Sequence, residues 1–133
     1  MEEDSLISLI KSRRSIRNFK NIDVNENEIN KILEAGIWSP TGTNQQELKY
    51  LVIKDDQILK EFSKYKKIKT AKCVIMIFID YENYYKDYGN LREHPHKRDL
   101  PYIDTGLSMM NMMLHDIENP HIKQTDTKLK SKK

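Results

Sequence analysis

Three arginines and a serine lie close together near the start of the chain and could bind a phosphate. They are Arg13, Arg14, Ser15 and Arg17. Guanidinium groups present forked donors that match phosphate oxygens two at a time, and the hydroxyl adds an uncharged donor. The alternative is a solvated basic turn, the usual fate of a charge run. The segment therefore predicts either an anion site or an exposed turn.

A polar loop further along the chain could bind the edge of a heterocycle. It runs from Ser39 to Gln46, and Pro40 and Gly42 keep its backbone out of regular structure. Its backbone amides can therefore turn toward a ligand. Asn44 and Gln46 each carry a side-chain amide, which both donates and accepts hydrogen bonds. This mixture of donors and acceptors suits a heterocyclic ring with a mixed polar edge.

The two segments together resemble those of the nitroreductase-like flavoprotein family. In that family a helix ends in Arg-Arg-Ser-x-Arg-x-Phe, which residues 13–19 match, and a second helix leads into Ser-Pro-Ser/Thr-x-x-Asn-x-Gln-Pro-Trp. Residues 39–46 match that loop, but Glu47-Leu48 stand in place of the Pro-Trp pair. Asp104-x-Gly106 followed by Asn111 is a third match. The resemblance covers residues 5 to 118.

The resemblance implies an α+β fold with a mixed sheet flanked by helices, in an intertwined homodimer that holds FMN at its interface. The chain is short for this family, so we expect the fold to be incomplete at its C-terminus. A nitroreductase-like domain is expected over residues 1–120. Residues 121–133 are expected to form a basic, disordered tail, because they hold five lysines and only two apolar residues.

For function, the resemblance implies an FMN-dependent oxidoreductase with NAD(P)H as a transient electron donor. Hydride would pass through the flavin to a small electron-poor acceptor of the nitroaromatic or quinone type, so no catalytic side chain is expected. The alternative is a degenerate dimerisation domain that has lost FMN and catalysis. The cofactor-binding residues that the resemblance implies are Arg13, Arg14, Ser15 and Arg17, together with Pro40, Thr41, Gly42 and Asn44, the latter four from the partner subunit.

Helical patterns precede both segments. Asp4 or Ser5 can cap a first helix that runs to about Lys11. A second helix is predicted to begin at Asn25, with Glu28 completing a capping-box-like pattern. Its buried face is Ile29, Ile32, Leu33 and Ile37. Trp38, at its end, is expected in the core or at a dimer interface, because an indole buries a large area.

Further elements follow the polar loop. Tyr50 to Ile53 predicts a strand, and Asp55-Asp56 begins another short helix. Cys73 to Ile79 is continuously apolar, which is typical of a strand buried on both faces. Residues 81–98 are expected to be irregular, as a surface flap or as an aromatic cover over a planar substrate. Cys73 itself is expected to be a small core residue.

The last predicted element is a long helix with the clearest apolar periodicity in the chain. Its stripe alternates steps of three and four residues through Leu100, Ile103, Leu107, Met110, Leu114 and Ile117. Further methionines widen the stripe, so the helix is apolar on several sides. We expect it to be buried, at a subunit interface.

Composition excludes several classes of protein. The 133 residues suit one domain, and no apolar run approaches a membrane span. The net charge of +3 comes from the tail, so a nucleic-acid partner is not expected. The single cysteine and the acidic N-terminus favour a cytoplasmic protein with no membrane partner. His94-x-His96 has no further ligand at a convincing spacing, so no metal is expected.

Overall fold

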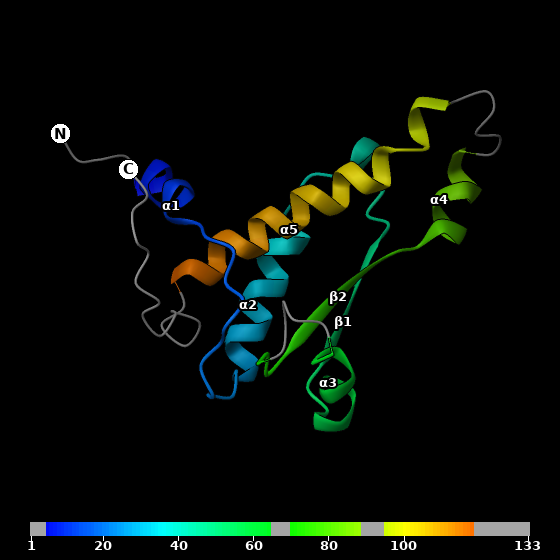
Figure 1. The fold of residues 1–133 in the computed structure, drawn as a ribbon. Helices are drawn as coiled ribbons and strands as arrows, with labels where there is room; N and C mark the ends of the chain where they lie inside the picture. The colour runs from blue at the N-terminus through cyan, green and yellow to red at the C-terminus, as the bar shows by residue number, and fades with distance from the viewer. Residues whose placement is uncertain (1–4, 65–69, 89–94, 119–133) are drawn as a thin grey trace.

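The fold combines helices with a small sheet, which confirms the predicted α+β class. The computed structural model describes residues 5–64, 70–88 and 95–118 (Figure 1). Along the chain the elements are α1 (Ser5–Ser12), α2 (Glu26–Ile37), the 3₁₀ turn η1 (Gly42–Asn44), β1 (Leu48–Ile53), α3 (Asp56–Phe62), β2 (Val74–Ile79), α4 (Tyr81–Tyr88), the 3₁₀ turn η2 (Pro95–Lys97) and α5 (Leu100–Glu118). The predicted tail, residues 121–133, lies outside the described residues, as does His94.

Two helices begin at the caps that the sequence predicts. The Asn25 side chain accepts a hydrogen bond from the backbone N–H of Glu28 at 2.9 Å and so starts α2. The Asp55 side chain accepts hydrogen bonds from the N–H groups of Gln57 and Ile58, each at 3.0 Å, and starts α3. Each cap satisfies donors that a helix start otherwise leaves unpaired.

The sheet consists of β1 and β2, which pair antiparallel from Leu48 opposite Ile79 to Ile53 opposite Val74. Within the described residues it holds no parallel pair, so the predicted mixed sheet is not observed there. The expectation that β2 is buried on both faces is wrong, because its residues are only half-buried and Phe78 is exposed. An apolar run of β-branched residues indicates a strand, but it does not show that both faces are covered.

One part of the core lies where α2 crosses α5. Ile29 and Ile32 of α2 pack here with Met112 of α5, and all three side chains are buried. The helices approach closely at Gly36, where an added Cβ would lie 2.9 Å from the sulfur of Met112. The side chain of Asn111 donates a hydrogen bond to the carbonyl of Ala35 at 3.2 Å. The third sequence match thus includes a polar group that fixes this crossing.

The two faces of α5 differ from the sequence expectation. The face turned inward carries Pro101, Asp104, Ser108 and Met112, all of which are buried. The predicted apolar stripe instead points outward at Ile103 and Leu107, which remain 57% and 42% exposed. In the single chain, therefore, a face with two polar residues is covered, while the middle of the apolar stripe is exposed.

Residues 81–98 are more regular than predicted, because they contain α4 and η2. The ring of Tyr84 is fully buried, and its hydroxyl donates a hydrogen bond to the backbone carbonyl of Lys97. This contact joins α4 to η2 just before α5 begins.

In the described part of the chain, no helix has the length and apolar character needed to cross a membrane.

Candidate functional site

The loop between α2 and β1 has an unusual backbone. Thr43, Asn44 and Gln46 have φ values of 55°, 54° and 53°, in the left-handed region that side chains other than glycine rarely adopt. Each such residue costs about 1–2 kcal/mol, so the conformation persists only when its surroundings enforce it. Strained segments of this kind gather at binding sites. The backbone thus marks residues 39–46 independently of any sequence motif.

Hydrogen bonds within the loop enforce part of this conformation. The backbone N–H of Asn44 donates to the carbonyl of Thr41 at 3.0 Å, and the N–H of Gln46 donates to the hydroxyl of Thr41 at 3.0 Å. The Gln46 side-chain amide donates to the side-chain oxygen of Asn44 at 3.0 Å. Thr41 therefore organises the loop from within, and two amide side chains are held side by side.

Asp104 anchors the loop from outside. Its two carboxylate oxygens lie 3.1 and 3.0 Å from the backbone nitrogen of Gly42 and accept its N–H. Asp104 is buried on the inward face of α5. A hydrogen bond to a charged acceptor contributes more than one between neutral groups. The loop is thereby fixed to the long helix at the position where the family resemblance places Asp104.

Glu47 lies beside Asp104 and is only 2% exposed. Neither oxygen of its carboxyl group accepts a hydrogen bond from a donor among the described residues. Burial, together with the neighbouring Asp104, raises the pKa of Glu47 from 4.5 to about 7. Two carboxyl groups in such contact hydrogen-bond to one another only when they share a proton. A buried, protonatable pair therefore underlies the loop.

A hollow of about 510 Å³ opens beside the loop, within the range of about 300–1,000 Å³ that small-molecule sites occupy. It offers both amide groups and flat rings, and Trp38 at its edge is 80% exposed. Trp38 is therefore not in the core of the single chain, and its interface role stays a prediction. The lining residues are Gly36, Ile37, Trp38, Ser39, Pro40, Thr41, Asn44, Gln46, Leu48 and Tyr50.

A buried hydroxyl, that of Ser108, fixes two residues that line this hollow, Gly36 and Tyr50. Ser108 is 0% exposed, and its Oγ lies 2.7 Å from the hydroxyl of Tyr50 and 3.1 Å from the carbonyl of Gly36, to which it donates. Tyr50 is thus tied to both long helices. Sequence reasoning missed Ser108 and Tyr50 as site residues, because a serine in a helix and a tyrosine in a strand carry no distinctive spacing.

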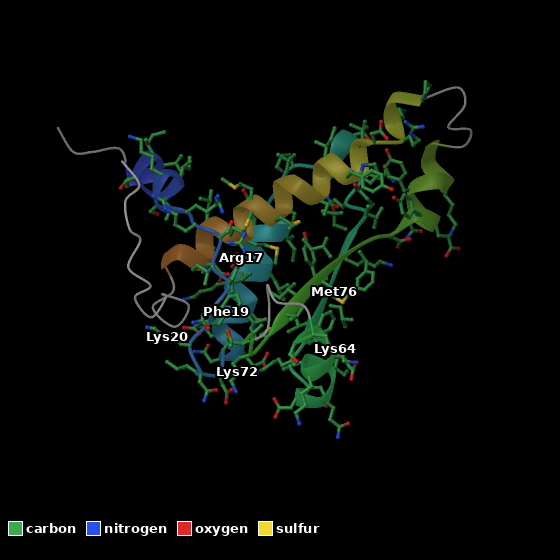
Figure 2. All side chains as sticks on the ribbon, viewed as in Figure 1. Arg17, Phe19, Lys20, Lys64, Lys72 and Met76 are labelled. Carbon is green, nitrogen blue, oxygen red and sulfur yellow. The ribbon has the colours of Figure 1, made fainter. Side chains whose placement is uncertain are left out.

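The basic segment lies elsewhere on the chain. Figure 1 shows α1, which precedes it, beside the C-terminal half of α5, whereas η1 lies beside the N-terminal half. Figure 2 shows Arg17 on the same side of the molecule as α1. None of the four predicted phosphate ligands lines the hollow beside the loop. One chain therefore does not bring the two predicted halves of the site together.

Within the basic segment the arginines differ. Arg14 donates to the backbone carbonyls of Lys11 and Arg13, at 2.7 and 2.8 Å, and so caps the end of α1. Arg17 and Ser15 are exposed, and Arg13 is half-buried. The segment is thus a basic, solvent-facing turn in the single chain, with Arg14 serving the helix that precedes it.

A second, mainly apolar hollow of about 230 Å³ lies between α2, α5 and β2. Phe19, Lys20 and Lys72, labelled in Figure 2, lie on its wall beside Cys73. Burial raises the pKa of the Cys73 thiol, which favours the unreactive protonated form. Cys73 is half-buried on the wall of this hollow and is not part of the core, contrary to the sequence prediction. In the described part of the chain, no three metal-ligating side chains come together.

Comparison with known proteins finds a matching family and several similar sequences and structures. The model of the nitroreductase family matches residues 10–69. A provisionally named NADH dehydrogenase/NAD(P)H nitroreductase of Archaeoglobus fulgidus is 35% identical over 63 residues, which are 47% of this chain and 35% of that protein. A provisionally named nitroreductase of Desulfovibrio desulfuricans, solved in complex with FMN, is 32% identical with a TM-score of 0.67. The match covers 85% of this chain but 62% of that one.

The likeness of fold extends to more distant sequences. The nitroreductase CinD of Lactococcus lactis, solved with 4-nitrophenol, is 21% identical and has a TM-score of 0.71. That match covers 85% of this chain and 68% of CinD. The chain thus spans less than two thirds of the Archaeoglobus and Desulfovibrio proteins.

Proposed function

We propose that the chain, whose residues 10–69 match the nitroreductase family, is an FMN-dependent oxidoreductase that takes hydride from NAD(P)H and passes it to a small electron-poor molecule. We expect nitroaromatic compounds or quinones as acceptors. The observation that supports the proposal most is the strained 39–46 loop, which lines the hollow and is fixed to α5 through Asp104. A loop held at this cost needs a reason beyond connecting two elements.

The groups beside the hollow fit a flavin. Thr41, Asn44 and Gln46 provide donors and acceptors for the polar edge of the ring system, and Trp38 and Tyr50 provide flat surfaces. Bound FMN would supply the hydride-transfer chemistry, which amino-acid side chains do not provide. The chain's own residues would orient the ring and exclude water from one of its faces.

The phosphate of FMN needs cations that the hollow does not offer. We propose that Arg13 and Arg17 provide these cations, that Ser15 adds an uncharged donor, and that Arg14 has a lesser role. Because the basic segment lies apart from the loop in one chain, this arrangement requires a second copy. The exposed apolar stripe of α5, with Ile103 and Leu107 at its centre, gives that copy a surface to bury. We therefore propose a homodimer in which each site takes its loop from one subunit and its cations from the other.

Flavin binding tests the proposal directly. The purified protein should be yellow or should take up added FMN, with quenching of flavin fluorescence, and should then oxidise NADH or NADPH in the presence of a nitroaromatic compound. Asn44→Gly removes the amide but suits the left-handed backbone, so it should weaken FMN binding without unfolding the loop. Lys60→Ala, on α3, is the matched surface control. A colourless protein that leaves micromolar FMN free would contradict the proposal.

A non-catalytic dimerisation domain is the second candidate. The observation that favours it is that Glu47 and Leu48 stand where the family pattern has a Pro-Trp pair. It predicts the same dimer through α5 but no flavin uptake. Sedimentation and the FMN titration together separate the two candidates. Both predict a dimer, but only the enzyme predicts FMN binding.

A further inference from the structure

The carboxyl pair beneath the loop has a role that neither a cofactor contact nor simple packing explains. Glu47 follows the loop directly, where the family pattern has proline, and its carboxyl group is turned into the protein beside Asp104. Asp104 in turn holds Gly42. Two buried carboxylates so close together repel each other strongly unless one of them carries a proton. The anchor of the loop is therefore coupled to a protonation equilibrium.

We propose that Glu47 and Asp104 are positioning residues that share one proton, and that loss of this proton releases Gly42 and the 39–46 loop from α5. While the proton is present, Glu47 donates it toward Asp104, whose oxygens also accept the Gly42 N–H. When the proton leaves, two negative charges face each other in a buried site. Rotation of Asp104 away from Glu47 relieves the repulsion but breaks its contact with Gly42.

Other charged groups near the pair are already engaged with one another. Asp80, whose backbone N–H donates to the carbonyl of Glu47 at 2.8 Å, is paired with Lys49 at 2.5 Å. Arg98, just before α5, is paired with Asp99 at 3.1 Å. Residues 39–46 contain no ionisable side chain. Among the described neighbours, then, Asp104 is the charged group that acts on Glu47.

The direction of the pH effect follows from the raised pKa. Glu47 holds its proton in the folded chain up to about pH 7, whereas the unfolded chain loses it near 4.5. The folded state therefore binds more protons between these values, so the contribution of the pair to stability is full below about pH 4.5 and is lost as the pH rises through 7. The loop should be held in mildly acidic solution and released in mildly alkaline solution.

The amide of Gly42 reports on the anchor without reference to any cofactor. The chain has four glycines, at positions 36, 42, 89 and 106, so glycine-selective ¹⁵N labelling of the full chain gives a simple spectrum. We expect the Gly42 signal to shift between pH 5 and 9 with a midpoint near 7, while Gly36, which lies against Ser108 and Met112, stays constant. A Gly42 signal that does not move over this range would overturn the proposal.

Two variants separate a shared proton from mere packing. Glu47→Gln keeps a donor toward Asp104 but cannot ionise, so Gly42 should keep its low-pH signal at every pH. Asp104→Asn gives Glu47 an uncharged neighbour that can donate to it, so the midpoint should move to lower pH. An unchanged midpoint in either folded variant would show that another group causes the shift, and the proposal would fall.

The consequence for the cofactor rests on the proposed function. If the loop binds FMN only while it is anchored, FMN affinity should fall about ten-fold from pH 6 to pH 8, following the protonated fraction of the pair. The FMN phosphate itself titrates near pH 6, so the wild type is compared with Glu47→Gln, in which the additional fall should be missing. Equal pH profiles of FMN affinity in the two proteins would show that the protonation of Glu47 does not affect FMN binding. No FMN binding at any pH would remove the proposed function, while the Gly42 titration would still test the pair.

Discussion

The 39–46 loop and the 13–17 segment are stabilised in opposite ways. The loop adopts a costly backbone, yet hydrogen bonds to Thr41 and Asp104 hold it within one chain. The basic segment has an undemanding conformation, and apart from Arg14 its cations face solvent. The first region is held in a fixed conformation within the single chain, whereas the second has charge but no enclosure.

This difference indicates where preorganisation is needed. A ring system is oriented by fixed donors and acceptors, which lose little entropy on binding when they are already rigid. A phosphate tolerates long, mobile guanidinium groups, because the attraction between charges depends less on angle. A site assembled from two subunits can therefore take its rigid half from one chain and its charged half from the other.

The largest effect is expected from breaking the contact between subunits. Leu107→Glu places a charge at the centre of the outward stripe of α5, where burial in an interface would be opposed by desolvation. We expect self-association to weaken by at least about a hundred-fold, in the range of an interface hot spot. Sedimentation velocity measures it, with Lys60→Glu on α3 as the control. A wild-type protein that is monomeric at micromolar concentration would refute the two-subunit site.

The next largest effect is expected from removing the anchor of the 39–46 loop. Asp104→Ala removes the acceptor of the Gly42 N–H and leaves a partly buried donor unpaired, so the free energy of unfolding should fall by about 2–3 kcal/mol. Urea unfolding at pH 6 measures the change. Asp23→Ala, an exposed carboxylate outside the loop, should stay within about 0.5 kcal/mol of the wild type. Equal stability of the two variants would mean that the loop does not depend on its anchor.

Arg17→Ala should act on binding and leave folding unchanged. Loss of a charge-assisted contact to the cofactor should weaken FMN binding roughly ten- to a hundred-fold. The urea midpoint should not change, because Arg17 is exposed in the single chain. Titrations at low and high salt add a check, since the contribution of an exposed charge is screened. An FMN titration identical to that of the wild type would remove Arg17 from the site.

The smallest effect is expected for Arg14→Ala. Its guanidinium already donates to the carbonyls of Lys11 and Arg13, so less of it is available to a phosphate. We expect FMN affinity to change by about two-fold or less, the size typical of a weak surface contact. The same titration serves, with Arg17→Ala as the reference. If Arg14→Ala proved as harmful as Arg17→Ala, the distinction between the two arginines would be wrong.

Local chemistry made much of the fold predictable. Caps at Asn25 and Asp55 mark helix starts because the side chain and the amides it binds are only two or three residues apart. The loop could be predicted as a candidate site because its residue types match a known pattern. The three left-handed residues were not, since Thr43 in particular has no intrinsic preference for such a backbone. Hydrogen bonds within the loop and the tertiary contact with Asp104 together hold that conformation.

The faces of α5 show what a periodic pattern leaves open. Periodicity locates the apolar stripe, but it does not say whether the same chain or another one covers it. Asp104 and Ser108 would be placed outward by polarity alone, yet both are buried because they meet polar groups of the loop, α2 and β1. Such partners lie far away in sequence, so no local pattern reveals them.

The long sequence separation of these contacts has a consequence for folding order. Asp104 comes 62 residues after Gly42, and Asn111 comes 76 residues after Ala35. Closing such long loops costs entropy before any contact is gained, so these pairings form late. During synthesis the α2–β1 connection must wait, without its anchor, until α5 has left the ribosome. We therefore expect the first half of the chain alone to lack a stable fold, although the family pattern is most recognisable there.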